Sequence, residues 1–525
     1  MASRCLLVQN IAGTLSRSNV AKVGLGDALN MFVETQNPNE HSTQLLMRSA
    51  SGERKFVESP LDGRCRGMFR VSRGIDGNPA LYVVFGQKLY LVDADADIHE
   101  IATLDTVGSE VRMVETGGYA SAHPHLVLVD GVNCYAVDCT VPVATQRSDF
   151  RTIALPVRPD DPTTNIKPTF IAYCYNYLAI NDAGSDAYYL SYQYPFETTT
   201  SNSEIDYDIF RLASTAGIGF ITYSEWCPDI TSCLVCTGSK MYTLGPRSWQ
   251  AWSYNDSATY PFSSPDNAAG NVGIKAPNSA AVLGKFVFFL GSSDVGENGV
   301  FTLTDTTITR ISTGDIEREI ASMNNPENAY GQVWQEHRHT FYSLTFEDSK
   351  VTYVYDVAEN AWHRRASYDA SNNLTFWRYN HATFAYNRTM VAGENYLCFM
   401  DENTYEEHDG RRILKMRRGG VMTSNDQPFY IDAAEIVTNN GQHSFNLDTR
   451  DDFNPRVSIR YSWDGSTWSD YEDYYLGFIG NYEYSTTIWQ LGLGRFFTLE
   501  ISTTEKIPFA IENLKVSWNP CSSFI

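Results

Sequence analysis

Apolar and polar positions along residues 81–410 repeat a short pattern: an apolar, β-rich run, a turn of Gly, Asp or Asn, and a second apolar run that often carries Tyr. A repeat of about 50 residues built around a hairpin is typical of a β-propeller blade. The pattern therefore predicts an all-β chain with a β-propeller of six or seven blades over residues 61–410. The seven copies are Leu81–Asp93, Leu126–Asp138, Tyr177–Leu190, Cys233–Leu244, Phe286–Leu303, Thr340–Asp356 and Met390–Met400.

The segments on either side of the repeats have different patterns. Residues 1–60 are polar and irregular, and they predict an arm that packs on its own propeller or on a neighbouring subunit. From residue 428 onward the apolar alternation becomes cleaner, as in Arg456–Trp463, and the repeat period is lost. We expect residues 428–525 to form a C-terminal antiparallel β-sandwich.

One segment within the repeats predicts a helix. The sequence GDIEREIASM follows Thr313, which can cap the first turn, and Ile316 and Ile320 are spaced to share one face. We expect this helix to pack against the edge of a blade.

Two loops, at residues 195–209 and 253–270, are longer than most connections in a compact domain. Loops of this length are usually functional or form interfaces, so both are candidates for partner contacts.

Residues 411–427 join the repeats to the sandwich and begin with a basic run. Two interpretations stay open: a solvated linker, or a strip that pairs with acidic partners or with DNA phosphate. The residues of this candidate interaction strip are Arg411, Arg412, Lys415, Arg417 and Arg418.

Charge and composition narrow the classes of function. With 40 basic and 62 acidic residues, the net charge is −22, which argues against a general nucleic-acid binder. It does not argue against a wall past which DNA slides without sticking. The 10 cysteines lie mostly in apolar runs, and neither a signal peptide nor a membrane span is evident, so we expect reduced thiols and folding in a cytoplasm.

Motifs for catalysis or for cofactor binding are weak. No phosphate-binding G-x-x-x-x-G-K-[ST] occurs, and no G-x-S-x-G nucleophile elbow is present. Cys233 and Cys236 have a metal-like spacing, but they lie in an expected strand without a second pair, which favours buried thiols. We expect no catalytic, cofactor-binding or metal-binding residue.

Three further patterns are better explained by structure than by chemistry. The pairs His123/His125 and His337/His339 can each chelate a metal, but neither shows a third ligand. The aspartates of Asp93–Asp97 lack the Gly and Glu of a calcium loop. The turn in Ser462–Trp468 is similar to a sialidase Asp-box, but it occurs once and favours a plain Asp-Gly hairpin.

The order of several short segments along the chain resembles one known family. These segments are Ala28–Met31, Arg73–Gly74 before Ala80–Asp93, Ala216–Phe220 before Cys233–Leu244, and above all Gly273–Ile320. Their order and spacing, from about residue 28 to the C-terminus, are similar to those of the tail hub or nozzle protein of short-tailed bacteriophages, also called the packaged-DNA stabilisation protein.

The resemblance implies structural work in a virion tail. Members of this family form a ring, similar to a hexamer, below the portal and its adaptor ring; the ring extends the DNA channel and holds the needle or plug, or tail fibres or spikes. Double-stranded DNA passes through without sequence-specific binding, and assembly takes place in the bacterial host cytoplasm. The alternative is a glycan-binding or glycan-hydrolysing propeller of a tail-associated protein, with Trp463 and Trp468 in a carbohydrate pocket.

Overall fold

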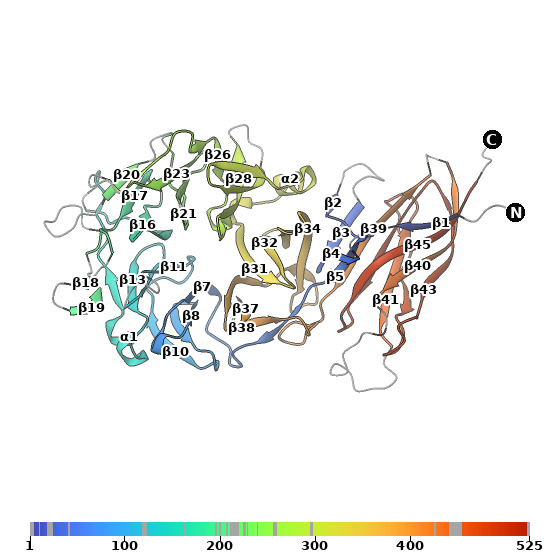
Figure 1. Ribbon diagram of the computed structural model, residues 1–525, viewed down its shortest axis with the longest axis horizontal. Coiled ribbons are helices and arrows are strands. Elements are labelled where there is room, and N and C mark those ends of the chain that lie inside the picture. Colours follow the sequence, from blue (N-terminus) through green and yellow to red (C-terminus); the bar gives the residue numbers. More distant parts are fainter. Residues whose placement is uncertain are drawn as a thin grey trace.

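The computed structural model describes residues 5–521 apart from 10, 18–24, 40–41, 118–122, 162, 195–196, 199–200, 206–207, 211–219, 224–226, 228, 239, 256–259, 294–297, 425–426, 440 and 442–453. These residues form a β-propeller joined to a β-sandwich, with β1 (Cys5–Gln9) and β45 (Ala510–Pro520) at the sandwich end (Figure 1). Most of Ala216–Phe220, one of the segments that carries the family resemblance, lies outside the described residues.

The propeller has seven blades, and each predicted hairpin lies in a different blade. The prediction of an all-β propeller is therefore confirmed, with seven blades rather than six. From the inner to the outer strand, blades one to four are β7 (Cys65–Val71), β8 (Ala80–Phe85), β9 (Lys88–Val92) and β10 (Ile98–Thr103); β11 (Arg112–Glu115), β12 (His125–Val129), β13 (Cys134–Asp138) and β14 (Arg151–Ile153); β15 (Ile171–Cys174), β16 (Tyr177–Asn181), β17 (Ala187–Leu190) and β20 (Phe220–Tyr223); and β21 (Cys233–Thr237), β22 (Lys240–Leu244), β23 (Trp249–Tyr254) and β24 (Phe262–Ser263).

The remaining blades carry short additional strands. Blades five to seven are β26 (Val272–Ile274), β28 (Phe286–Ser293), β29 (Asn298–Thr304) and β30 (Thr307–Arg310); β31 (Tyr330–Glu336), β32 (His339–Phe346), β33 (Val351–Asp356) and β34 (Ala361–Tyr368); and β36 (Tyr379–Ala385), β37 (Arg388–Gly393), β38 (Leu397–Asp401) and β6 (Gly52–Lys55). The additions are β25 (Ala269–Gly270) on β23, β27 (Ala281–Leu283) on β28, and β35 (Leu374–Phe376) on β34. Within the long loop at 195–209, β18 (Glu197–Thr198) pairs with β19 (Ser201–Ile205).

An N-terminal strand closes the ring of blades. The inner strands contact one another in the order β7, β11, β15, β21, β27, β31, β36 and back to β7. The outer strand of blade seven is β6, which pairs antiparallel with β38 although it precedes blade one in sequence. Part of the predicted N-terminal arm is thus a propeller strand, which ties both ends of the propeller segment together.

Aromatic side chains fill the spaces between neighbouring blades. Tyr342 of blade six stacks on Phe288 of blade five with ring centroids 5.1 Å apart, and Tyr188 of blade three meets Trp252 of blade four edge-on at 5.4 Å. Pairs of this kind add stability beyond their area of burial. The apolar alternation of each hairpin therefore serves the contacts between blades.

The sandwich draws strands from both ends of the chain. One sheet has the order β3 (Leu25–Leu29), β39 (Lys415–Thr423), β44 (Phe496–Thr503), β41 (Arg456–Ser462) and β42 (Glu472–Tyr475), with β2 (Ser16–Arg17) on β3. The other has the order β4 (Met31–Asn39), β5 (Ser42–Ser49), β45, β40 (Phe429–Thr438) and β43 (Thr486–Gly494), with β1 on β45. Residues 415–423, which we expected to belong to a linker, form a central strand.

A shared strand joins the propeller to the sandwich. Strand β3 pairs with β34 of blade six on one side and with β39 on the other, so that one sheet runs through both parts. Asp27 of β3 forms an ion pair with Arg364 of β34, with 3.0 Å between Oδ1 and Nε. The Asn30 side-chain amide donates to the carbonyls of Ala366 and Leu414. These contacts make the junction part of a sheet rather than a flexible tether.

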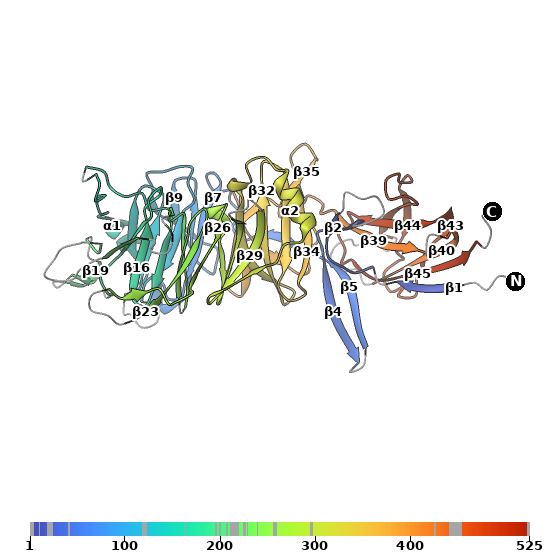
Figure 2. The ribbon, with the colours of Figure 1, turned by 90° about the horizontal axis from the view of Figure 1, so that it is seen from above.

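The hairpin of β4 and β5 projects from the body of the molecule beside this junction, as Figure 2 shows. Its base is held by Phe32, which is buried against Phe341 of blade six at 5.2 Å between ring centroids.

Short helices decorate the propeller. The predicted helix is confirmed as α2 (Gly314–Ala321), with Ile316 and Ile320 buried; Thr313 occupies its N-cap position, but its side chain makes no capping hydrogen bond. The other helices are α1 (Val143–Asp149) and the short 3-10 turns η1 (Ile75–Gly77), η3 (Pro277–Ser279) and η4 (Pro326–Asn328). Among the residues described, none of the helices is long and apolar enough to span a membrane.

Candidate functional site

One face of the propeller gathers the loops that lead into the inner strands, and we call it the entry face. At its centre lies a cavity of about 510 Å³. It is lined by Gly63, Arg64, Arg66, Gly86, Val107, Gly108, Ser109, Glu110, Gly131, Thr169, Asn278, Asn328, Tyr330 and Glu347. These residues come from blades one, two, three, five and six and from the segments that lead into them, so the cavity lies on the propeller axis.

Side chains of different blades cross the axis beneath this cavity. Glu110, just before β11, meets His381 of blade seven at 3.0 Å between Oε2 and Nε2. Arg112 of blade two donates to the Asn278 side-chain oxygen of blade five at 3.1 Å. Burial opposes ionisation of Glu110, but His381 and Arg112 hold its pKa below its usual value. The axis is therefore bridged by charged and polar contacts and offers no open bore.

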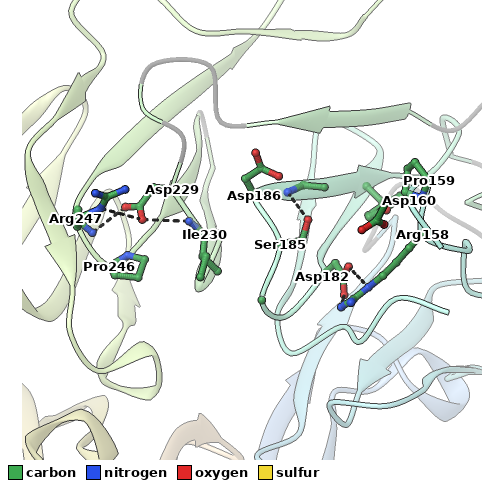
Figure 3. A pocket seen from close by; sticks show the side chains of 13 residues that line it. Arg158, Pro159, Asp160, Asp182, Ser185, Asp186, Asp229, Ile230, Pro246 and Arg247 are labelled. Carbon is green, nitrogen blue, oxygen red and sulfur yellow. Dashed lines mark hydrogen bonds and ion pairs between the residues drawn. The ribbon is translucent and has the colours of Figure 1, made fainter. Parts of the chain in front are cut away.

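A second and larger cavity, of about 720 Å³, lies between blades three and four on the entry face. Figure 3 shows its two walls, one carrying Asp229, Ile230 and Arg247 and the other carrying Asp182 and Asp186. We call it the blade 3–4 cleft.

Internal ion pairs hold both walls of the blade 3–4 cleft. Asp182 is buried and pairs with Arg158, with 2.8 Å between Oδ1 and Nη2 and 2.7 Å between Oδ2 and Nε. Asp229 is also buried, and its Oδ2 accepts the backbone N–H groups of Arg247 at 2.8 Å and Ser248 at 2.9 Å. These carboxylates anchor loops, because their oxygens are already engaged.

Other groups in the cleft are open to solvent. Asp160 is exposed, Asp186 is partly exposed, and Ile230 retains 42% of its surface. The cleft thus combines an apolar wall with exposed carboxylates, a pattern that suits a protein segment carrying an apolar and a cationic side chain.

The candidate interaction strip is only partly at the surface. Lys415 is fully buried, and its Nζ donates to the carbonyls of Glu505 and Ile507 at 2.8 Å each; burial lowers its pKa to about 7. Arg417 is buried too and donates from Nε to the Ile11 carbonyl at 2.8 Å, and burial lowers its pKa to about 10.

The other three members of the strip differ in exposure. Arg418 is half-buried and pairs with Glu500, with 2.7 Å between Nε and Oε2. Arg411 donates to the Tyr368 carbonyl at 2.8 Å, while Arg412 is exposed above the Tyr368 ring. The expectation of one continuous basic strip in solvent is therefore wrong: the alternation of β39 turns Lys415 and Arg417 into structural residues.

The cysteine and histidine candidates are held in local structure. Cys233 is a buried free thiol on β21, and Cys236 is a partly buried one on the same strand. His339 is buried with Nδ1 at 2.7 Å from Oδ2 of Asp356, and His123 contacts Asp138 at 3.1 Å. Over the described ranges, no group of three or more His, Cys, Asp or Glu is placed to hold a metal ion.

The acidic turns and the Asp-box-like turn are also local. The Asp93 side chain accepts the backbone N–H groups of Asp95 and Asp97 at 3.0 and 2.9 Å. Trp463 donates from Nε1 to the Leu491 carbonyl and packs between the two sheets, and Trp468 lies beside the guanidinium groups of Arg418 and Arg460 at 4.9 and 5.0 Å.

The free edge of the sandwich exposes a cluster of large apolar side chains that the sequence pattern did not single out. It contains Tyr471, Tyr475, Phe478, Tyr482, Trp489 and Leu493, which retain between 45% and 70% of their surface. The aromatic density of residues 471–493 was the available signal, but exposure depends on which strands lie at an edge.

Taken together, a closed propeller axis, pre-formed surface clefts and an exposed sandwich edge define a scaffold protein built on a seven-bladed β-propeller. Residues 28–405 match the family described as "Bacteriophage P22 Gp10, beta-propeller". The chain belongs to this family of phage structural proteins, whose role is to stabilise packaged DNA. The match ends before the last three strands of the sandwich, so the resemblance expected up to the C-terminus is shown only as far as residue 405.

Solved structures share the propeller at low similarity. The N-terminal domain of Nup159 has a TM-score of 0.35 and 11% identity, covering 69% of this chain and 97% of that one. The AfRom2 CNH domain has a TM-score of 0.36 and 9% identity, covering 66% and 99%. The dihydro-heme d1 dehydrogenase NirN, in complex with DHE, has a TM-score of 0.35 and 9% identity, covering 84% and 76%. At these values the similarities carry no argument about function. No curated protein matches the chain.

Proposed function

We propose that this protein is the hub or nozzle subunit of a phage tail. In this proposal it forms a homohexameric ring below the portal and its adaptor ring, extends the DNA channel, retains the packaged genome, and docks the tail tip or fibres. It is made in the bacterial host cytoplasm, ends in the virion tail, and has no enzymatic activity.

The observation that carries the proposal is the closed propeller axis in a chain of a DNA-stabilising family. Because Glu110, His381, Arg112 and Asn278 bridge the axis, DNA cannot thread a single propeller. A chain that retains DNA must then border a passage formed by several copies. A closed ring with heterologous interfaces provides such a passage.

The charge of the chain supports the same arrangement. At a net charge of −22, its surface repels phosphate, so DNA leaves without the many basic contacts that would hold it. Two of the basic residues in the candidate interaction strip, Lys415 and Arg417, are also withdrawn from solvent. We therefore propose that DNA slides along the ring without sequence-specific binding.

The glycan-active alternative has less support from its expected residues. Trp463 fills the sandwich core, and Trp468 is flanked by two guanidinium groups. Burial opposes ionisation of Glu500, but Arg460, Tyr471 and Arg418 hold its pKa below the usual value, which is unsuited to a general acid.

Negative-stain microscopy tests the proposal. We expect the purified chain, alone or with its adaptor ring, to form rings with an open axis. A particle that stays monomeric and never joins the adaptor ring would overturn it. Binding or turnover of host surface polysaccharide would favour the glycan-active alternative.

A further inference from the structure

We propose that the free edge of the sandwich, through Trp489, Leu493 and Arg495, seats in the blade 3–4 cleft of a second copy of this chain. This contact would be the head-to-tail interface of the ring, and it therefore rests on the proposed function. The argument combines the exposed edge, the composition of the cleft and the positions of both on the molecule.

The sandwich is tied down at one edge and open at the other. At the tied edge, β3 continues into blade six, while β42 and β43 are the last strands of their sheets at the opposite edge. The Thr486 hydroxyl donates to the Tyr475 carbonyl at 3.1 Å, which holds these two end strands together. An uncovered pair of edge strands is a ready site for association.

A bulge in β43 directs its large side chains outward. Gln490 adopts a φ of 60°, and the pairing of β43 with β40 shifts register there. Leu491 is consequently buried, while Trp489 and Leu493 keep 70% and 47% of their surface. Bulges often re-aim side chains at sheet edges. Arg495, exposed in the turn that follows, places a cation beside this apolar pair.

The blade 3–4 cleft has the complementary composition. Its apolar wall is Ile230, and its exposed carboxylates are Asp160 and Asp186. Of its two arginines, Arg158 is engaged by both oxygens of Asp182, and Arg247 lies 3.7 Å from Asp229. The volume of about 720 Å³ accommodates an indole and a neighbouring side chain.

The two surfaces lie at opposite ends of the molecule. In Figure 1, strands β16, β17, β21 and β23 around the cleft are far from β43 along the longest axis. A surface that binds a different surface of the next copy generates a closed ring or an open filament, and it does not stop at a dimer. In an acidic chain, a local pairing of Arg495 with Asp160 and Asp186 also offsets repulsion between copies.

A charge exchange tests the contact directly. We expect Arg495→Glu and Asp186→Lys each to raise the concentration at which half the chain is assembled by about tenfold, as measured by mass photometry. The chain carrying both changes should recover, because every copy then offers the reversed pair. Arg412→Glu and Asp95→Lys are matched exposed controls and should leave assembly unchanged.

An apolar variant keeps the test independent of charge. Trp489→Asp should abolish rings while the melting temperature stays near that of the wild type, whereas Phe384→Asp, at a side chain 55% exposed on the opposite propeller face, should not affect them. If wild-type rings form and the Arg495, Asp186 and Trp489 variants assemble equally well, this contact is wrong and the ring stands. If the wild type never forms rings, both proposals fail.

Discussion

At the scale of single residues, buried charges fix the closure of the propeller. Arg365 is buried between Glu336, at 2.7 Å from its Nη1, and the Ser51 carbonyl, at 2.8 Å from its Nη2. Burial opposes ionisation of Glu336, but Arg365 lowers its pKa to about 2. Glu53, on the closing strand β6, accepts from Trp377 Nε1 at 3.1 Å, and burial raises its pKa to about 8. One arginine thus balances one carboxylate, and the second carboxyl is neutral at pH 7.

This arrangement predicts a pH dependence of stability. Because the folded pKa of Glu53 lies above its ordinary value of 4.5, the folded state holds more protons between these values, and stability falls as the pH rises from about 4.5 through about 8. Glu53→Gln removes the ionisation and should flatten this fall, by on the order of 3 kcal/mol at pH 9. Melting temperatures from pH 5 to 9 measure the effect, with the exposed Glu58→Gln as control. Equal slopes for Glu53→Gln and the wild type would contradict the assignment.

At the scale of elements, the repeat pattern predicted what local periodicity determines. The seven hairpins and helix α2 were predictable because their apolar spacing, turns and capping position are local signals. Strand β6 was not, since its partner β38 lies more than three hundred residues later and its four residues carry no repeat. Strand β39 read as a basic linker because burial of Lys415 and Arg417 depends on carbonyls from distant segments. The blade 3–4 cleft was unpredictable for the same reason.

Closure by β6 leads to a prediction at Gly52. A side chain there would place its Cβ 2.2 Å from the Glu406 carbonyl oxygen, so the backbone of β6 or of residues 404–406 must shift. We expect Gly52→Val to loosen β6 from β38, lower the melting temperature, and expose residues around 50–56 to limited proteolysis, at a cost of about 2–4 kcal/mol. Gly108→Ala, whose Cβ meets no atom within 4 Å, is the matched control. Unchanged cleavage in the Gly52 variant would show that β6 is not the closing element.

At the scale of the whole molecule, the propeller and the sandwich are one folding unit in sequence terms. The N-terminal strands β3, β4 and β5 lie in the sandwich, and the next strand, β6, lies in the propeller. Trp463 links the two sheets of the sandwich, with ring centroids 5.6 Å from Phe429 and 5.1 Å from Phe497. A chain that shares strands in this way transmits force between its parts through hydrogen-bonded sheet, which suits a subunit that resists the pressure of packaged DNA.

Truncation distinguishes shared strands from independent domains. A chain of residues 1–410 keeps β3, β4 and β5 but loses their partners β39 and β45, so it should expose unpaired strand edges and aggregate. A chain of residues 51–410 keeps β6 and all seven blades. It loses the contact of Phe32 with Phe341, worth about 2 kcal/mol, and should still fold as a soluble monomer. Size-exclusion chromatography and thermal melting compare the two chains. The shared-strand arrangement predicts that the shorter chain behaves better, whereas an independent sandwich predicts that both behave alike.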